Sequence, residues 1–308
     1  MRVVARRTGL SPDLLRAWER RYDVVRPTRT DGGQRNYSDA DIERLQLLVR
    51  ATHAGRQISQ VAELDNDALR RMIAEDLAAT PVTIASAGDQ AAVAAFMDDA
   101  LGAIESFNAA SLEATLRSAA LHLPSEEVLD LLFGPLLKTI GMRWQEGRMP
   151  PANEHLATAV IRRVLTWMMD FPNVRPDAPS IVVGTPAFQN HDLGAMLAAT
   201  AASLSGWHVM FLGANLPAAE LTRAAGMVNA DTVALSIVHP TDDSRVSDEL
   251  RELRASLPKT VGLVVGGAGA SAYLGLLDEI GAHRMDSIRT LRAWLGSRAE
   301  LHRRASAV

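Results

Sequence analysis

From residue 180 onward, short apolar runs typical of buried β-strands alternate with segments typical of α-helices, and this alternation constrains the fold most strongly. The run Ser180-Ile-Val-Val-Gly184 is rich in β-branched residues, as strands buried on both faces are. We expect strands at 180–185, 208–213, 231–238 and 260–266, with a weak fifth near 283–286. Helices are expected at 193–205, 218–228, 243–256, 272–280 and 287–305. The pattern predicts an open, doubly wound α/β sheet over residues 180–305, with a ligand crevice at the carboxyl ends of its strands.

Small and polar residues stand where these strands are expected to end. The first strand is followed by His191-Asp192-Leu193-Gly194, in which Asp192 is placed to cap the next helix. The third strand ends with Ser236-Ile237-Val238, and the fourth with Gly266-Gly267. A small hydroxyl and glycines at neighbouring strand ends leave room for something long and flat to enter the sheet edge. No Gly-x-Gly-x-x-Gly or Walker loop follows the first strand, so a nucleotide-phosphate site has little support.

The N-terminal part of the chain is basic and the remainder is acidic. Residues 1 to 56 hold 12 Arg and 7 Asp or Glu, a net +5; from totals of 32 Lys and Arg and 36 Asp and Glu, this leaves 20 minus 29, or −9, for the rest. We therefore expect an anionic partner for the head alone. A helix at 3–9 and a second helix from Ser11-Pro12 to Arg20 predict a helix-turn-helix. An arginine-flanked Gly32-Gly33 hairpin and a helix capped by Ser38 and running through Thr52 follow.

The segments Arg16-Ala-Trp-Glu-Arg-Arg-Tyr22, Arg26-Pro27, Gly32-Gly-Gln-Arg-Asn-Tyr37 and Ser38-Asp-Ala-Asp41 together resemble the MerR family of winged-helix regulators. The resemblance implies a winged helix-turn-helix over residues 1–75 that binds a double-stranded DNA operator as a dimer. It implies five DNA-contacting residues: Arg16, Arg20, Tyr22, Arg35 and Tyr37. A solvated helix face is the alternative for the arginines. Core packing is the alternative for Tyr37, and it is the preferred interpretation for Trp18.

Between the head and the sheet, helical periodicity predicts a bundle. A short helix at 64–73 is followed by an expected linker at 76–89. Four helical segments, at 90–106, 108–121, 124–146 and 151–169, predict a four-helix bundle over residues 90–171, with a second linker at 172–179. Trp144 lies near the end of the third helix, and Glu154-His155 opens the fourth, with nine residues between tryptophan and glutamate. Taken singly, the tryptophan fits a core residue and the Glu-His pair fits an exposed surface.

The combination His191-x-x-Gly194, Ser236-x-Val238 and Gly266-Gly267 resembles the flavodoxin-like (Rossmann-type) cobalamin-binding domain of methionine synthase and the corrinoid mutases. In that family the histidine is the lower axial cobalt ligand and the displaced cofactor tail descends into the fold. The resemblance implies that His191 ligates cobalt and that the cofactor is also bound by Asp192, Gly194, Ser236, Gly266 and Gly267. The family has an acid two residues before the histidine, where this chain has Gln189. The partner for the far ring nitrogen of His191 is thus either the amide oxygen of Gln189 or Asp192.

With the MerR-like head and the pattern of Trp144, Glu154 and His155, the whole chain resembles the CarH-type light-sensing, B12-dependent regulators. The resemblance implies a repressor, not an enzyme, with adenosylcobalamin between bundle and sheet. Trp144 would cover the upper face of the cofactor, and Glu154 and His155 would lie beside its adenosyl group. In the dark the loaded protein is expected to self-associate as a dimer or tetramer, and light is expected to break the cobalt–carbon bond and the assembly. Some relatives carry a histidine directly after the tryptophan, where this chain has Gln145.

Other functions stay open on the sequence. A light-independent sensor of cobalamin supply keeps the cofactor, whereas a corrinoid carrier subunit of a methyltransferase or mutase belongs to another class; the head argues against the carrier. A domain that has lost its cofactor is favoured only by Gln189. The absence of cysteine excludes disulfides and thiolate metal sites. No apolar run approaches the roughly 20 residues of a membrane span, and no signal-peptide pattern opens the chain, so we expect a cytoplasmic protein.

Overall fold

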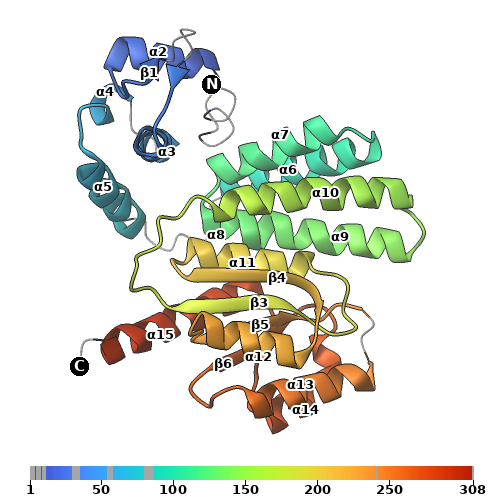
Figure 1. The fold of residues 1–308 in the computed structure, drawn as a ribbon. Coiled ribbons are helices and arrows are strands. Elements are labelled where there is room, and N and C mark those ends of the chain that lie inside the picture. The colour runs from blue at the N-terminus through green and yellow to red at the C-terminus, as the bar shows by residue number, and fades with distance from the viewer. Residues whose placement is uncertain are drawn as a thin grey trace. The chain divides into compact units, whose positions relative to one another are not determined.

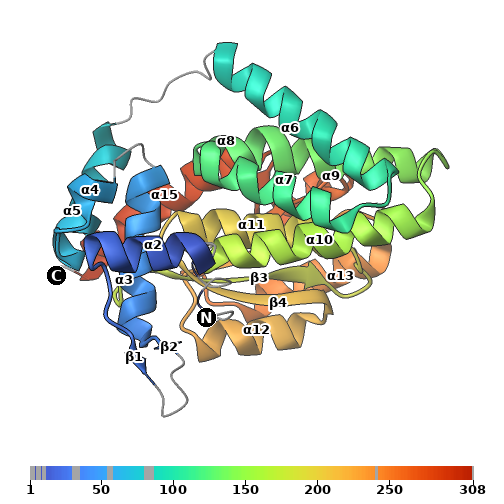
Figure 2. The same ribbon diagram turned by 90° about the horizontal axis from the view of Figure 1, so that it is seen from above.

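The structure is a computed structural model that describes residues 4, 8, 12–29, 35–53, 58–79, 87–239 and 242–306. The chain divides into two compact units, Met1–Ser86 and Ala87–Val308, which can be followed by colour in Figure 1 and Figure 2. Within the described ranges, every helix is too short or too polar to cross a membrane.

The first unit consists of helices around a small core and a two-stranded wing. Its elements are α2 (Pro12–Tyr22), β1 (Thr28–Arg29), β2 (Arg35–Asn36), α3 (Asp39–His53), α4 (Ile58–Val61) and α5 (Asn66–Ala79), and the two strands pair antiparallel. Leucines fill the core, and Trp18 packs among them, as predicted. The amide of Asp41 donates to Ser38 Oγ, and the amide of Ser38 donates to the Asp41 carboxylate. This reciprocal capping fixes the start of α3 where the sequence predicts it.

Two predictions for this unit lie partly outside the described residues. Of the helix predicted at 3–9, only Val4 and Thr8 are described, and both are buried. The Gly32-Gly33 turn of the wing also lies outside them. The helix predicted at 64–73 is longer than expected, because α5 continues to Ala79. Its last turns contain three alanines, the residue with the highest helix propensity.

The second unit begins with the predicted four-helix bundle. Its elements are α6 (Ala87–Glu105), α7 (Ala109–His122), α8 (Ser125–Glu127), the π-helix η1 (Val128–Phe133), α9 (Gly134–Gln145) and α10 (Pro151–Met169). The third predicted helix, at 124–146, is therefore not a continuous α-helix. Pro135 lacks an N–H and its ring would clash with the carbonyl four residues earlier, so the chain widens there, and the amide of Gly134 donates to the carbonyl of Leu129.

The sheet of the second unit has five parallel strands in the order β4-β3-β5-β6-β7. The strands are β3 (Ser180–Pro186), β4 (His208–Leu216), β5 (Thr232–Ser236), β6 (Gly262–Gly266) and β7 (His283–Met285). The helices are α11 (Leu193–Leu204), α12 (Ala218–Met227), α13 (Ser244–Ser256), the 3-10 helix η2 (Ala270–Tyr273), α14 (Leu274–Glu279) and α15 (Ile288–Ser306). These positions confirm the predicted α/β pattern. Because β3 pairs with both β4 and β5, the carboxyl ends of β3 and β5 form a topological switch point, where such sheets bind ligands.

The helix α11 lies between the sheet and the bundle (Figure 1), and its sequence explains how it packs against both. Ala195, Ala199 and Ala202 belong to the core that faces the sheet together with α15. Met196 and Leu197 belong to the core of the bundle instead. A helix that is apolar on opposite faces buries both. The helices α12, α13 and α14 cover the other face of the sheet, away from the bundle.

Candidate functional site

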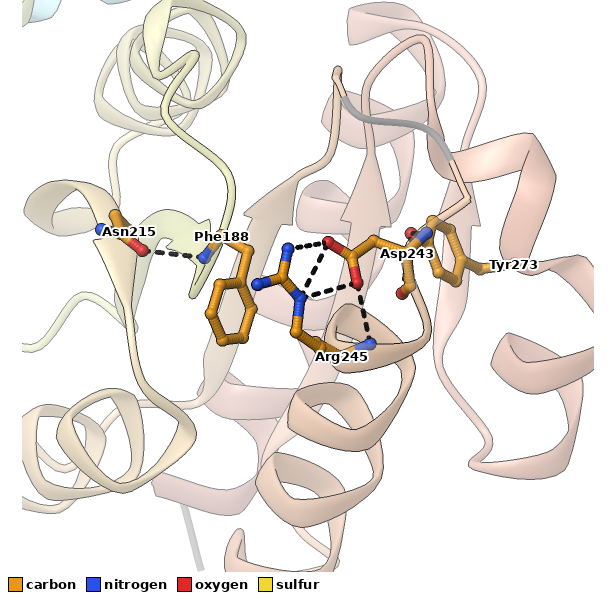
Figure 3. Close-up of polar contacts among 5 residues, drawn as sticks. All are labelled: Phe188, Asn215, Asp243, Arg245 and Tyr273. Carbon is orange, nitrogen blue, oxygen red and sulfur yellow. Dashed lines mark hydrogen bonds and ion pairs between the residues drawn. The ribbon is translucent and has the colours of Figure 1, made fainter.

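The loop from β3 to α11 presents His191, which is exposed at the carboxyl edge of the sheet. Asn215, at the end of β4, holds this loop from one side. The backbone amide of Asn215 donates to the backbone carbonyl of Gln189 over 3.0 Å. The side-chain Oδ1 of Asn215 accepts the backbone amide of Phe188 over 2.8 Å. Figure 3 shows the second of these bonds. Phe188 has a φ of +71°, which a bulky residue rarely adopts, so these bonds maintain a strained turn just before the histidine.

A cluster next to this turn braces Phe188 further (Figure 3). The guanidinium of Arg245 lies 4.2 Å from the centroid of the Phe188 ring and forms an ion pair of 2.7 Å with Asp243. The hydroxyl of Tyr273 accepts the amide of Asp243 over 2.9 Å. The hydrogen bond from Arg245 lowers the pKa of Asp243, which keeps this carboxylate charged beside the arginine. The turn before His191 is thus held by the end of β4 and by the start of α13.

Gln189 is fully buried and ties the loop to the adjacent strand end. Its Oε1 accepts the backbone amides of Val238 and His239 over 3.0 and 3.2 Å, just after β5. In the sequence this oxygen is one of two candidates to accept a hydrogen bond from the ring of His191, the other being Asp192. In the structure the oxygen serves the backbone of the β5 loop instead.

Asp192 stands at the N-cap of α11 but does not cap it with its side chain. Its carboxylate accepts two hydrogen bonds of 2.7 Å each from Arg162 on α10, and it is largely buried. The predicted side-chain cap is therefore wrong, because the carboxylate turns to the guanidinium of the bundle. The hydrogen bond to Asp192 raises the pKa of Arg162 above its usual value. The residue beside His191 thus fastens the sheet to the bundle.

A strip of small residues at the carboxyl edge of the sheet consists of Gly194, Ser236, Gly266 and Gly267. Ser236 and Gly266 end β5 and β6, two residues beyond Ala234 and Val264, which face α11 and α15. Because side chains alternate along a strand, positions 236 and 266 face that same layer. A Cβ at Gly194 would lie 2.6 Å from Ser236 Oγ, and one at Gly267, whose φ is +95°, would collide with the carbonyl of Ile237.

The hydroxyl of Ser236 is the polar group of this strip. It is buried and has no hydrogen-bond partner within the described ranges. An unpaired buried hydroxyl is costly and calls for an explanation, such as a polar ligand atom that completes it. The strip therefore fits the buried tail of a large cofactor that carries hydrogen-bonding groups.

The bundle extends past the start of α11, beyond the carboxyl edge of the sheet. Thr200 donates to the carbonyl of Leu165, and Ser203 to that of Met169, so α10 and α11 run parallel with an offset of about 35 residues (200 − 165 and 203 − 169). This offset places the first residue of α11 beside residue 158 of α10. The two turns of α10 before that point project about 10 Å further, as Figure 1 and Figure 2 agree.

The three bundle residues singled out in the sequence lie at this projecting end. Trp144 lies in the last turn of α9 and is 46% exposed, which contradicts its interpretation as a core residue. His155 is exposed, and its Nδ1 lies 2.8 Å from Glu154 Oε2. The other oxygen of Glu154 accepts the hydroxyl of Thr158 over 2.7 Å. A half-exposed indole and a paired imidazole thus both lie at the end of the bundle that projects beyond α11.

In the first unit the predicted DNA-contacting residues fall into two groups. Arg16 and Arg20 are exposed on α2, and Tyr22 is half-buried at its end. Arg35 and Tyr37 flank the wing, and both bond to Glu19 of α2: Arg35 Nε donates over 3.0 Å, and the Tyr37 hydroxyl donates to the other oxygen. Burial, and then the bond to Glu19, raises the pKa of Tyr37. Tyr37 is only 9% exposed, so its aromatic ring packs in the core.

Sequence reasoning missed Glu19 and Arg162. Glu19 is an acid among the arginines of α2, and that exception to the charge of its helix is the signal that was available. Arg162 gave no comparable signal, because its partner is 30 positions away in another layer.

Comparisons with known proteins agree with this architecture. The MerR HTH family regulatory protein model matches residues 1–67, and two B12 binding domain models match residues 85–168 and 179–285. The HTH-type transcriptional repressor CarA of Myxococcus xanthus is 30% identical over 295 residues, covering 95% of this chain and 94% of CarA. The HTH-type transcriptional repressor CarH of the same organism is 29% identical over 281 residues, covering 91% and 92%.

A solved structure is similar in fold. The monomethylamine corrinoid protein of Methanosarcina barkeri superposes with a TM-score of 0.51 at 19% identity, covering 66% of this chain and 99% of that chain. Bundle, parallel sheet and winged head together define a MerR-type regulator of transcription that binds DNA and cobalamin. The chain belongs to the family of CarA and CarH, the B12-dependent MerR-type regulators.

Proposed function

We propose that this chain represses transcription from a DNA operator and uses adenosylcobalamin as a light-sensing chromophore. His191 is the lower axial ligand of cobalt, and the tail of the cofactor occupies the strip between the sheet and its covering helices. Residues proposed to touch the cofactor are Trp144, Glu154, His155, Asp192, Gly194, Ser236, Gly266 and Gly267. Those proposed to touch DNA are Arg16, Arg20, Tyr22, Arg35 and Tyr37.

The observation that carries this proposal is the half-exposed Trp144 at the end of the bundle that projects past the sheet edge. An indole at the surface offers a large, flat apolar area that a flat ligand can cover. The exposed His155 lies at the same end, and the His191 loop lies at the sheet edge below. A flat cofactor between these two surfaces would meet an aromatic face above and an imidazole below.

In this proposal the residues of the chain have distinct tasks. His191 holds the cofactor from the sheet, Trp144 excludes water above it, and Glu154 orients His155 beside the upper group. When bound, adenosylcobalamin supplies a cobalt–carbon bond that visible light breaks. With the upper group present, Trp144 and His155 would hold the bundle at one spacing from the sheet, and without it the bundle would be free to shift. This shift would change the self-association of the chain, from a tetramer or dimer to a smaller species. It would also change the affinity of the chain for DNA.

A second candidate is a light-independent sensor of cobalamin supply. Gln145, which follows Trp144 and is exposed, favours it, because an amide is a much poorer cobalt ligand than the histidine of some relatives. In this alternative, binding of the cofactor alone changes assembly and operator affinity.

Gel filtration with adenosylcobalamin in darkness and after green light tests the proposal. The loaded protein should elute as a larger species in darkness, and as a smaller one with weaker operator binding after illumination. Cyanocobalamin, which lacks the adenosyl group, is the matched control and should give no light-dependent change. Bound cofactor with a size and DNA affinity that ignore light would support the supply sensor. A cofactor that never co-elutes with protein would reject both candidates.

A further inference from the structure

If His191 binds cobalt through one ring nitrogen, its other ring nitrogen, the outer one, carries an N–H that needs a hydrogen-bond acceptor. The structure limits which residues can be that acceptor. An imidazole that binds a metal through one nitrogen normally donates its other N–H to a neighbouring group, which fixes its orientation and raises its basicity. Carboxylates are common partners in that role. Such a partner has a role only if His191 binds cobalt as proposed above.

The two partners that the sequence suggested are both engaged elsewhere. The Oε1 of Gln189 accepts the backbone amides of Val238 and His239, and the side chain is fully buried. Both oxygens of Asp192 accept hydrogen bonds from Arg162. Drawing either group to His191 would leave two buried backbone amides or a charged guanidinium without their acceptor, which is unfavourable.

A second imidazole lies beside the first. The ring centroids of His191 and His239 are 6.3 Å apart, with the ring planes at 59° to each other. Two imidazoles joined by an N–H···N bond of normal length have centroids about 5 Å apart. Both histidines are exposed, so rotation about their side-chain bonds, or one bridging water, spans the remaining distance.

The backbone keeps the two rings close. His239 follows β5, which pairs directly with β3, the strand that leads to His191. The amide of His239 is held by Gln189, two residues before His191 in the same loop. The residue that replaces the family's acid therefore positions the backbone of the second histidine.

We infer that His239 is the positioning partner of His191, accepting the N–H of its outer ring nitrogen so that an imidazole takes the place of the usual carboxylate. A neutral imidazole forms a weaker hydrogen bond with that N–H than an anionic carboxylate does. The His191 ring is consequently a weaker donor to cobalt than in a carboxylate-supported site, and the cofactor dissociates more readily.

Variants of the full-length protein with bound cobalamin test this inference. His239→Phe keeps an aromatic ring but removes both nitrogens, His239→Gln keeps an acceptor, and His239→Asp supplies a carboxylate. The matched control is His283→Phe, since His283 is also exposed but lies in β7 beside Trp294. The measurements are the Kd for cobalamin and the nitrogen splitting in the EPR spectrum of the cob(II)alamin form. The splitting reports an axial nitrogen, and its change when the histidines of the protein carry 15N assigns that nitrogen to an imidazole of the chain.

We expect His239→Phe to raise the Kd about tenfold with the nitrogen splitting retained, as loss of a supporting group around a metal typically does. His239→Gln should stay near wild type, His239→Asp should bind more tightly, and His283→Phe should not differ. Equal Kd values for wild type, His239→Phe and His239→Asp would overturn the inference while leaving His191 as the ligand. If the wild-type spectrum shows no nitrogen splitting and His191→Ala leaves the Kd unchanged, His191 is not the cobalt ligand. The proposed role of His191 then fails, and the inference about His239 fails with it.

Discussion

The guanidinium of Arg162 grips the carboxylate of Asp192 through two hydrogen bonds of 2.7 Å each, and this pair fastens the helical bundle to the residue beside His191. Arg162 is partly exposed, so solvent weakens the pair. Its position beside His191 nevertheless makes it a polar link between the bundle and the proposed cofactor site.

Replacing Arg162 with Gln should therefore loosen the bundle above His191. We expect a loss of about 1 kcal/mol in the free energy of unfolding, together with faster release of cobalamin. Arg163→Gln is the matched control, because Arg163 pairs with Glu113 inside the bundle. Urea denaturation and the rate of cofactor release measure the two effects. If both variants released cofactor equally fast, the Arg162 pair would have no special link to the site.

Adding one methyl group to Gly194 should block the strip at the sheet edge. The new Cβ would lie 2.6 Å from Ser236 Oγ, so Gly194→Ala should reduce cobalamin binding at least tenfold. Combining it with Ser236→Gly removes the obstructing hydroxyl and should restore part of the binding. Gly102→Ala, where the methyl group meets nothing within 4 Å, should raise stability by up to about 1 kcal/mol and leave binding unchanged. Equilibrium binding and thermal denaturation decide the matter, and unimpaired binding by Gly194→Ala would place the cofactor tail elsewhere.

The contacts of Glu19 with Arg35 and Tyr37 predict a variant that alters selectivity for DNA. Glu19→Gln removes the negative charge that holds the wing arginine against α2. Binding to operator should weaken because the wing is less fixed, whereas binding to unrelated DNA should strengthen because one acid is gone. The ratio of the two affinities should fall severalfold in fluorescence anisotropy at fixed salt. A parallel change in both affinities would indicate an effect of charge alone.

Acid should weaken the bundle through Glu113. Burial tends to raise the pKa of Glu113, but hydrogen bonds from Arg163 and Arg117 outweigh it and hold the pKa below the ordinary 4.5. A lowered pKa in the folded state contributes stability above the unfolded value, and that contribution is lost as the pH falls through the folded value. Glu113→Gln should thus be less stable than wild type at pH 7, and the difference in stability should be smaller at pH 3. The exposed Glu252→Gln is the control, and an equal loss at both pH values would refute the assignment.

The layers of the fold were predictable because apolar residues recur in the sequence with the spacing of the buried faces of strands and helices. The β-branched runs before Gly184 and Gly266 mark strands covered on both faces, and the breaks at Asn108 and Pro150 mark helix ends. The π-helix before Pro135 was not predicted, since the same apolar spacing fits an α-helix as well. Only the missing N–H of the proline distinguished the two.

The candidate site was predictable at its individual residues and not in its connections. His191, Gly194 and Ser236 were found because strand ends can be located in the sequence. The bonds of Gln189 to the β5 loop, and of Asp192 to Arg162, depend on strand register and helix offset, which local patterns do not encode. The same limit applies to His239, which became a candidate only once β5 lay beside β3.

Because of the offset between α10 and α11, a small tilt of α10 produces a larger displacement at its first turns. A rigid rod that projects about 10 Å beyond its support moves its tip by about 2 Å when it tilts by about 10°. A hydrogen bond tolerates only about 0.5 Å of such movement. A tilt of this size is thus large enough to make or break contacts at Glu154 and His155, so the first turns of α10 respond most to movement between the bundle and the sheet edge.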